Sequence, residues 1–268
     1  MISVVTVIHD SAKHLTRLLA SLERHAPQAQ VVVVDSGSSD DGARIARGHG
    51  AEVVDLPHNP GFGPANNAGV ERARHEVTAL LNPDVELLDD GLLRLADGVT
   101  DGTLLFPRLL DPDGSVQDSA HPLPGTCSEI VRALLPARIA PQPYRATATR
   151  EIGWAIAAAV VATTRTLHAL GPFDADAFMF YEDMDLCLRA ERCELHPDIA
   201  LRHVGGHSTG PDRLSVEAAR RREVIGERLG ATALRRDDAA QALTFLRAGI
   251  RSRRAREQLA ALRVARRA

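Results

Sequence analysis

Hydrophobic residues follow two alternating patterns in the first half of the chain. Runs of β-branched residues such as "ISVVTVI" predict buried strands, and hydrophobic residues at helical spacing, as in "AKHLTRLLASLERH", predict helices between them. The expected strands span 2–8, the "VVVV" run within 29–42, 51–56 and 77–87, and the expected helices span 12–25, 43–50 and 63–75. The pattern therefore indicates an α/β protein.

Strand–helix alternation with continuously apolar strands favours a mostly parallel sheet that is covered by helices on both faces. In open sheets of this kind, ligands bind beyond the carboxyl ends of the strands. Polar residues stand at those ends here, namely Asp10, Asp35, Asn59 and the "NPD" of 82–84. The sequence therefore predicts a binding site at this edge of the sheet.

The rest of the chain changes character twice. Residues 107–150 are rich in Pro and turn-forming residues, which predicts an irregular excursion laid over the site on the acceptor side. Residues 151–174 return to a strand and then a helix, and the chain after residue 215 is charged and helical. The expected organisation is one domain over 1–215 and a basic helical extension over 216–268.

The composition argues against a nucleic-acid-binding, secreted or membrane-spanning protein. A net charge of -3 provides no overall basic field for nucleic acid. Three cysteines without a CxxC spacing predict free thiols and a cytoplasmic location. The start "MISVVTVIHD" lacks the pattern of a signal peptide, and no apolar run approaches the roughly 20 residues that span a bilayer.

Asp35 ends a β-branched run and is followed by the small-residue turn "SGSSDDG". A carboxylate in this place can accept a hydrogen bond from a pyrimidine N3–H, while the turn lets the backbone approach the base. The alternative is that Ser38, Ser39 or Asp40 caps the helix that follows. Both interpretations can hold.

The segment "HNPGFGPANNAGVERA" (58–73) begins as a turn and ends as a helix. Gly61 and Gly63 let the backbone approach a ligand, and Asn67 can bond to one. The alternative is an ordinary Gly/Pro/Asn loop with a helix cap. A phosphate loop of the GxxxxGK[ST] type and a GxGxxG after a strand are both absent.

Two segments contain candidate metal ligands. Asp84 follows a buried strand in "LLNPDVEL", and one carboxylate with diphosphate oxygens and water is a common way to hold Mg²⁺ or Mn²⁺. In "LRHVGGHSTG" (201–210), His203 and His207 flank a Gly pair, and one imidazole could complete the site with Asp84. The alternatives are a plain Asn-Pro-Asp turn and structural histidines.

A cluster of acids lies beside the aromatic run "AFMFY". In "YEDMDLCLRA" (181–190), Glu182, Asp183 and Asp185 precede a helical pattern. The helix dipole favours first-turn carboxylates, which is the structural explanation. Apolar neighbours raise the pKa of a carboxylate, which suits a general base near neutral pH. Arg189, one turn on, is a candidate ion-pair partner for Asp185.

Taken in order over roughly residues 2–210, these motifs resemble the inverting GT-A glycosyltransferases of family 2. That family has an acid after the second strand for the nucleobase, a "GFGxxxNxG" segment, a DxD-type metal motif, an "ED" pair with the catalytic base, and a metal-binding His. The resemblance matches them to Asp35, Gly61–Gly69, Asn82–Asp84, Glu182–Asp183 and His203. It implies a Rossmann-like GT-A fold.

Within the family, four segments resemble rhamnosyltransferases that use dTDP-L-rhamnose, including those that act on GlcNAc-diphospho-polyprenol in cell-wall assembly. They are "DPDGSVQDSAHPLPG" (111–125), "GW" (153–154), "FDADAFMFYEDMDLCLR" (173–189) and "HSTG" (207–210). The chain departs from the family at Asp10, where Asn is usual, at "IAAA" (156–159) and at Thr163–Thr164. These departures concern the acceptor more than the donor.

The resemblance implies a mechanism and its participants. Asp183 would take the proton of an acceptor hydroxyl, Glu182 would orient it, and Asp84 and His203 would hold Mg²⁺ or Mn²⁺ at the leaving nucleoside diphosphate. Phe178 and Phe180 would limit water access. Further contacts to a dTDP- or UDP-sugar are implied for Asn82, Trp154, His207 and Ser208. The acceptor would be a glycan or a lipid-linked sugar.

The C-terminal segment has two interpretations. Residues 247–267 contain many Arg and almost no acid, with Leu246, Ile250, Leu259 and Leu262 between them. Such a helix can lie on an anionic membrane as a peripheral anchor, at about 1 kcal/mol per basic residue. The alternative is a helix packed on the core or on a second subunit in a homodimer.

Two rival functions stay open at this point. One is a family 2 transferase that uses a UDP-sugar such as UDP-GlcNAc or UDP-galactofuranose. The other is a protein that binds a nucleotide-sugar without catalysis, which the departures at 156–164 keep open.

Overall fold

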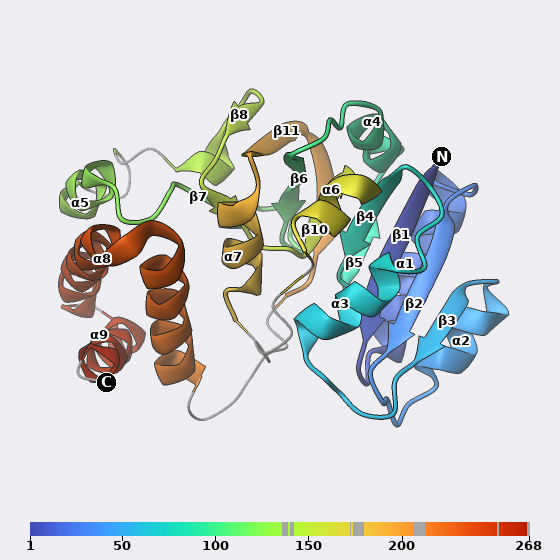
Figure 1. Cartoon of the computed structure of the whole chain (residues 1–268), viewed down its shortest axis with the longest axis horizontal. Helices are drawn as coiled ribbons and strands as arrows, with labels where there is room; N and C mark the ends of the chain where they lie inside the picture. The colour runs from blue at the N-terminus through green and yellow to red at the C-terminus, as the bar shows by residue number, and fades with distance from the viewer. Residues whose placement is uncertain are drawn as a thin grey trace. The chain divides into compact units, whose positions relative to one another are not determined.

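The computed structural model describes residues 1–135, 139, 142–171, 173, 180–205, 213–250 and 252–266. The chain divides into two compact units. The first consists of Met1–His121 and Tyr144–Gly205, and the second of Pro122–Pro143 and Gly206–Ala268. The first contains a large sheet, and the described part of the second is helical (Figure 1).

The sheet of the first unit has the strand order β3-β2-β1-β4-β10-β6-β11-β5 in the described residues, with β8 paired to β11. The strands are β1 (Ile2–Ile8), β2 (Gln30–Asp35), β3 (Glu52–Asp55), β4 (Val77–Leu81), β5 (Val85–Leu87), β6 (Thr103–Leu110), β8 (Arg150–Glu151), β10 (Ala159–Thr163) and β11 (Arg192–His203). β3, β2, β1 and β4 are parallel, as are β6 and β11. β10, β5 and β8 run antiparallel to their neighbours. The mostly parallel sheet is as predicted.

Helices cover both faces of this sheet, because successive strand residues point to opposite sides. Ile2 and Val4 of β1 share a core cluster with Leu18 and Leu22. On the opposite face, the adjacent Val5 meets Gly69, where a Cβ would lie 2.2 Å from Val5 Cγ1. The helices of this unit are α1 (Ala12–His25), α2 (Gly42–Gly48), α3 (Phe62–Val70), α4 (Gly91–Asp97), α6 (Thr164–Ala169) and α7 (Glu182–Arg189). Leu18 and Leu22 belong to α1 and Gly69 to α3.

The prediction of a single strand over 77–87 is wrong. The chain turns at 82–84, and β5 then pairs antiparallel with the end of β11 instead of continuing β4. The Val85 N–H donates to the Asn82 carbonyl oxygen at 3.1 Å, which closes the turn. Hydrophobic residues on both sides of the turn hide this break from a pattern analysis.

The interval 107–150 is less irregular than predicted. Strand β6 continues to Leu110, and a turn at Asp111–Ser115 leads to β7 (Ala120–His121), which pairs with β9 (Trp154–Ala155). Helix α5 (Cys127–Leu134) and a 3-10 turn (Pro143–Arg145) follow β7. Residues Pro122–Pro143, including α5, belong to the second unit.

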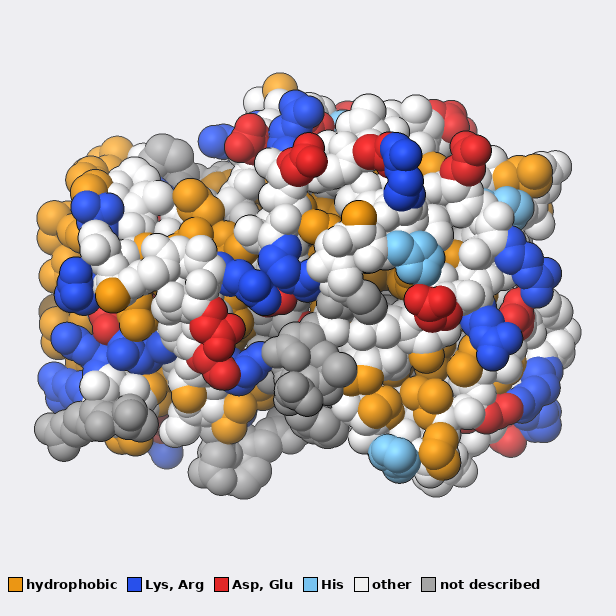
Figure 2. All heavy atoms as spheres, viewed as in Figure 1, with side chains coloured by type: hydrophobic (Ala, Val, Ile, Leu, Met, Phe, Trp, Pro, Cys, Tyr) orange, Lys and Arg blue, Asp and Glu red, His pale blue; other side chains and the backbone are white. Residues whose placement is uncertain are grey.

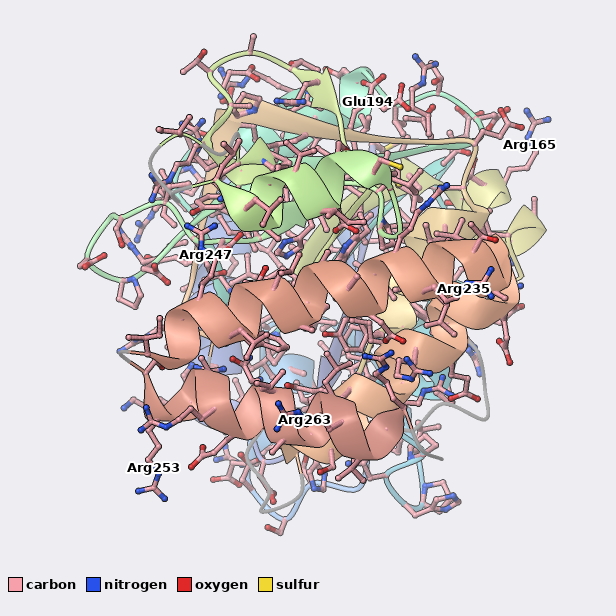
Figure 3. All side chains as sticks on the ribbon, turned by 90° about the vertical axis from the view of Figure 1, so that its left-hand side faces the viewer. Arg165, Glu194, Arg235, Arg247, Arg253 and Arg263 are labelled. Carbon is pink, nitrogen blue, oxygen red and sulfur yellow. The ribbon has the colours of Figure 1, made fainter. Side chains whose placement is uncertain are left out.

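The second unit is built around α8 (Arg213–Gly249), which Gly230 divides into two arms because its φ of 81° is not helical. Helix α9 (Arg253–Ala265) packs against α8, as does α5, and Figure 3 shows these helices side by side. The two arms are tied together by a bidentate ion pair, in which Arg221 donates to Asp237 at 2.6 and 3.0 Å. Asp237 is buried.

The segment before α5 fits closely against the second arm of α8. Gly125 has a φ of 72°, and a Cβ there would lie 2.6 Å from the Ala233 Cβ. The Gly125 N–H donates to Glu129 at 2.7 Å. Burial and the nearby Asp237 carboxylate raise the pKa of Glu129 to about 7. In the part of the chain that the structure describes, none of the helices has the length and apolar character needed to cross a membrane.

Candidate functional site

Asp35 stands at the end of β2, as predicted, opposite Ile8 of β1. Its side chain is 8% exposed, and its Oδ1 accepts the Ser38 N–H at 2.9 Å. The capping alternative is wrong as stated, because the N-cap of α2 is Asp41, whose side chain makes no cap hydrogen bond. Asp40 stands one residue earlier, and its Oδ1 accepts the N–H of Gly42, the first residue of α2, at 3.0 Å. The small-residue turn therefore holds a carboxylate at the strand end and begins the helix.

Asp10, at the end of β1, connects this turn to the neighbouring one. Its φ of 49° is left-handed, and its Oδ1 accepts the Ser39 N–H at 2.7 Å and the Ser39 hydroxyl at 2.9 Å. These hydrogen bonds lower the pKa of Asp10. Asp10, which departs from the family pattern, therefore joins the loops after β1 and β2 through hydrogen bonds to its carboxylate.

The Gly-rich segment before α3 needs a special backbone at one position. Gly61 has a φ of 99°, and its N–H donates to Asn59 Oδ1 at 2.9 Å. Gly63 is buried in the first turn of α3. Asn67 Nδ2 donates to the Phe173 carbonyl oxygen at 2.8 Å, so this amide fixes a later segment of the chain. Its buried Oδ1 lacks a hydrogen-bond partner among the described residues.

The structure brings Asp84 and His203 together from the turn after β4 and the end of β11. His203 Nε2 lies 3.4 Å from Asp84 Oδ1, and the two side chains are 8% and 10% exposed. The Gly205 N–H donates to Asp84 Oδ2 at 2.8 Å, and the Val204 N–H to the Asp84 carbonyl oxygen at 3.2 Å. The Asp84 side chain is therefore held with one oxygen toward the imidazole.

The "ED" pair lies at the start of α7, directly after Phe180 and Tyr181, which have left-handed φ values of 78° and 62°. Glu182 is buried, and the Met184 N–H donates to Asp183 Oδ1 at 2.8 Å. Asp183 is only partly exposed. Burial therefore raises the pKa of Asp183 to about 6, although the Met184 and Ala157 N–H groups stabilise its charge.

The predicted ion pair on α7 is confirmed. Arg189 Nε lies 2.9 Å from Asp185 Oδ2, with side-chain exposures of 16% and 7%. Arg189 also donates to the carbonyl oxygens of Leu170 and Gly171. Asp185 is therefore a structural acid that anchors α7 to the end of α6.

A backbone segment connects the two halves of the site. The Asn82 N–H donates to the Ala158 carbonyl oxygen at 2.8 Å, and the Ala157 N–H is a hydrogen-bond donor to Asp183. Residues 157–158 therefore lie between the Asn82–Asp84 turn and the start of α7. Both alanines belong to "IAAA" (156–159), where the sequence departs from the family pattern. This departure therefore lies at the site itself.

Thr163–Thr164, which also depart from the family pattern, lie at the opposite end of the strands from the Asn82–Asp84 turn. Thr163 pairs with Val77 at the beginning of β4, whereas Ala159 pairs with Leu81 near the Asn82–Asp84 turn. Thr163 Oγ1 caps α6 by accepting the Thr166 N–H at 3.1 Å. These threonines are structural.

Trp154 lies next to the "ED" pair and contacts two other aromatic rings. Its ring stacks on His121 with centroids 4.2 Å apart, and the Tyr181 ring lies 5.9 Å away. His121 Nδ1 lies 3.8 Å from Asp118 Oδ1. His121 was not predicted as a site residue. The available signal was its place in "DPDGSVQDSAHPLPG".

Several predicted site residues lie outside the described residues. They are Phe178, His207 and Ser208, so the structure does not place their contacts. Phe180, the other predicted shield, is half-buried at the start of α7.

The donor set around Asp84 fits a divalent cation in its chemistry. A carboxylate oxygen and an imidazole nitrogen face each other at 3.4 Å, and ligands of one ion lie about this far apart when its bonds are about 2.1 Å long. In the described residues, no group of three or more His, Cys, Asp and Glu side chains could hold a metal ion. A cation here would therefore need further oxygens, such as those of a diphosphate or water.

The open sheet with its acids at the strand ends has the GT-A fold, as the likeness to solved structures shows. The family model "Glycosyl transferase family 2" matches residues 3–139. The chain therefore belongs to glycosyl transferase family 2.

One relative is 28% identical over an alignment 248 residues long that covers 82% of this chain and 81% of the relative. It is the N-acetylglucosaminyl-diphospho-decaprenol L-rhamnosyltransferase of Mycobacterium tuberculosis. Two solved structures share the fold. TarS 1–349 of S. aureus has 19% identity and a TM-score of 0.58, with 94% of this chain and 73% of that chain covered. The mannosyltransferase PcManGT of Pyrobaculum calidifontis, in complex with GDP-Man and Mn²⁺, has 14% identity and a TM-score of 0.60, with coverages of 98% and 85%.

Proposed function

We propose that the chain is an inverting glycosyltransferase that moves L-rhamnose from dTDP-L-rhamnose to a hydroxyl of a polyprenyl-diphosphate-linked sugar in cell-envelope polysaccharide synthesis. The relative from Mycobacterium tuberculosis, which acts on N-acetylglucosaminyl-diphospho-decaprenol by its name, supports this choice. So do the segments that resemble dTDP-L-rhamnose-dependent enzymes, notably "FDADAFMFYEDMDLCLR".

The observation that carries the proposal is that residues 157–158 lie between a candidate cation site and a candidate general base. On one side, Asp84 and His203 would hold Mg²⁺ or Mn²⁺. When bound, the ion supplies Lewis-acid stabilisation of the negative charge on the leaving nucleoside diphosphate. On the other side, Asp183 would take the proton of the attacking hydroxyl, because desolvation raises its pKa to about 6.

The remaining site residues would bind and orient the two substrates. Asp35 would accept a hydrogen bond from the N3–H of the pyrimidine, and the backbone at Gly61 and Gly63 would approach the donor. Trp154 would provide a flat apolar surface for a sugar ring, and Glu182 would orient Asp183. Attack from the Asp183 side, opposite the leaving diphosphate, is a single displacement, which inverts the anomeric configuration.

A panel of donors tests the sugar nucleotide. Thermal shifts with dTDP and with UDP, each with Mn²⁺, should favour dTDP, and transfer should follow dTDP-L-rhamnose. The rival is a UDP-sugar donor such as UDP-GlcNAc or UDP-galactofuranose. Stabilisation by UDP together with turnover of a UDP-sugar would replace the donor assignment and leave the site assignment standing.

A single substitution separates catalysis from mere binding. Asp183→Asn should retain dTDP affinity while transfer falls at least about a hundredfold, as the loss of a general base implies. Unchanged transfer would contradict the role of Asp183. A wild-type protein that binds dTDP but transfers no sugar would instead establish the non-catalytic alternative.

The second unit carries the features expected of a membrane-facing surface. Exposed apolar side chains occur on α5 (Val131, 55%, and Leu134, 57%) and at the end of α8 (Leu246, 50%, and Ile250, 81%). Arg247 donates to the Leu135 carbonyl oxygen at 3.0 Å, which places the ends of these two helices together. Figure 2 shows hydrophobic and basic side chains mixed over the helices of the second unit, at the left of the view.

The arginines of the same region complement an anionic bilayer. Arg253 is 87% exposed and points outward at the start of α9, as Figure 3 shows. By contrast, Leu262 of α9 is buried and Leu259 is partly buried, so the packing alternative holds for those two residues. We therefore assign peripheral contact with the inner face of the plasma membrane to the ends of α5 and α8.

Vesicle co-sedimentation tests this surface. Leu246→Ser/Ile250→Ser should bind phosphatidylglycerol vesicles several-fold more weakly than the wild type, because about 25 cal/mol is lost per Å² of apolar area that no longer leaves water. Val216→Ser, which changes a residue that is 44% exposed on the other arm of α8, should bind normally. Equal binding by all three proteins would exclude the surface. Loss of a dimer in light scattering on the double substitution would assign the surface to a second copy.

A further inference from the structure

The hydrogen bonds of His203 continue beyond the proposed cation site. Its Nδ1 lies 2.7 Å from Gln117 Oε1, on the side of the ring away from Asp84. Gln117 Nε2 in turn donates to Asp111 Oδ1 at 2.9 Å. The three side chains therefore form a relay that ends at the imidazole.

The chemistry of Asp111 sets the direction of this relay. A carboxylate only accepts hydrogen bonds, so the amide NH₂ of Gln117 must face Asp111 and its oxygen must face His203. That oxygen also only accepts, so His203 Nδ1 must carry the hydrogen. In the neutral imidazole, the lone pair is then on Nε2, which faces Asp84 Oδ1 at 3.4 Å. Two acceptors that face each other favour a cation between them.

Backbone contacts fix each part of the relay. The Asp111 N–H donates to the Ser115 carbonyl oxygen at 2.8 Å, and the Gln117 N–H to the Leu109 carbonyl oxygen at 2.9 Å. Gly205 has a φ of 66°, and a Cβ there would lie 3.4 Å from His203 Cε1 and 3.5 Å from Gln117 Nε2. The relay is therefore closely packed from the turn on one side and from Gly205 on the other.

We propose that Gln117 and Asp111 are positioning residues that hold His203 in its Nδ1–H tautomer and so present the Nε2 lone pair to a divalent cation shared with Asp84. This inference rests on the cation site of the proposed function. Metal-binding histidines commonly donate their second N–H in this way, and substitution of the partner typically weakens metal affinity about 10–100-fold.

Two measurements on the full chain test the relay. Mn²⁺ affinity is read from the electron paramagnetic resonance signal of the free ion, with and without inorganic pyrophosphate. The tautomer of His203 is read without metal from ¹⁵N-histidine NMR, with the His203→Asn spectrum to assign its signals. The tautomer readout separates the relay from a merely structural role of the Asp111–Ser115 turn.

Gln117→Leu should weaken Mn²⁺ binding about 10–100-fold and mix the His203 tautomers. Asp111→Asn/Gln117→Glu should restore both, because the new Asn donates to the new Glu, which still accepts from His203. Ser115→Ala is the matched control in the same turn. It removes hydroxyl contacts to Asp111 and Asp113 but leaves the relay, so both readouts should stay unchanged.

The outcomes separate the relay from the proposed function. Retention of the Nδ1–H tautomer and of Mn²⁺ affinity in Gln117→Leu would overturn the relay alone. The same holds if the double substitution binds Mn²⁺ as weakly as Gln117→Leu. A wild-type chain that binds no Mn²⁺, even with pyrophosphate, would overturn the cation site itself and with it the purpose of the relay.

Discussion

The substitution Asp183→Asn should make the protein more stable at neutral pH while it removes activity. In the folded protein, burial raises the pKa of this carboxyl from 3.8 to about 6. The folded state therefore holds a proton between about pH 4 and 6 that the unfolded chain has released. Stability supplied by this group is present at low pH and is lost as the pH rises through about 6.

The magnitude follows from the size of the shift. About two pKa units correspond to about 3 kcal/mol at about 1.4 kcal/mol per unit, and partial exposure of the carboxylate reduces this to about 1–3 kcal/mol. Asparagine carries no charge, and its oxygen can still accept the Met184 N–H. We therefore expect Asp183→Asn to exceed the wild type in free energy of unfolding by about 1–3 kcal/mol at pH 8 and to match it near pH 4.

The assay is urea unfolding of both proteins from pH 4 to 8, together with initial rates of sugar transfer. Wild-type kcat/KM should rise with pH through an apparent pKa near 6, and the residual rate of the variant should lack this step. Asp41→Asn is the matched control, because Arg44 lowers the pKa of Asp41 and its stability effect should have the opposite sign. A variant that is less stable than the wild type at pH 8, with an unshifted rate profile, would refute a desolvated base at this position.

Further predictions concern the packing and the cation. Gly69→Ala should lower the free energy of unfolding by about 1–3 kcal/mol, because the new Cβ would overlap Val5, whereas Gly48→Ala, with open space around it, should change it by less than about 0.5 kcal/mol in thermal melts. Asp185→Asn should lower the free energy of unfolding by about 1–3 kcal/mol, because Arg189 would lose the charge of its partner while its hydrogen bonds to Leu170 and Gly171 remain, and a double-mutant cycle measures the coupling. Removal of divalent ions with EDTA should abolish transfer, and Mn²⁺ or Mg²⁺ should restore it.

Much of the fold follows from the sequence because the buried parallel strands are hydrophobic without interruption. Asp10, Asp35 and Asp84 could be placed at one edge because the carboxyl ends of parallel strands meet there. Only the family resemblance linked Glu182–Asp183 to them. The break after β4 could not be predicted, since Val85 and Leu87 continue the apolar pattern on a strand of the opposite direction.

Two kinds of site residue could not be predicted from the sequence, each for a physical reason of its own. Residues 157–158 act through backbone N–H and C=O groups, which every residue type possesses. Gln117 and His121 reach the site because the chain turns back after β6, and their spacing in the sequence carries no periodic signal. Resemblance pointed to their segment, but only the hydrogen bonds and ring contacts show which side chains of it meet the site.

The most direct measurement is a crystal structure with dTDP and Mn²⁺, using the anomalous signal of manganese. We expect a peak about 2.0–2.3 Å from both Asp84 and His203 Nε2, in contact with the diphosphate, and the Asp183 carboxylate on the far side of the sugar position. A manganese ion bound elsewhere, or a diphosphate that lies away from the Asn82–Asp84 turn, would contradict it.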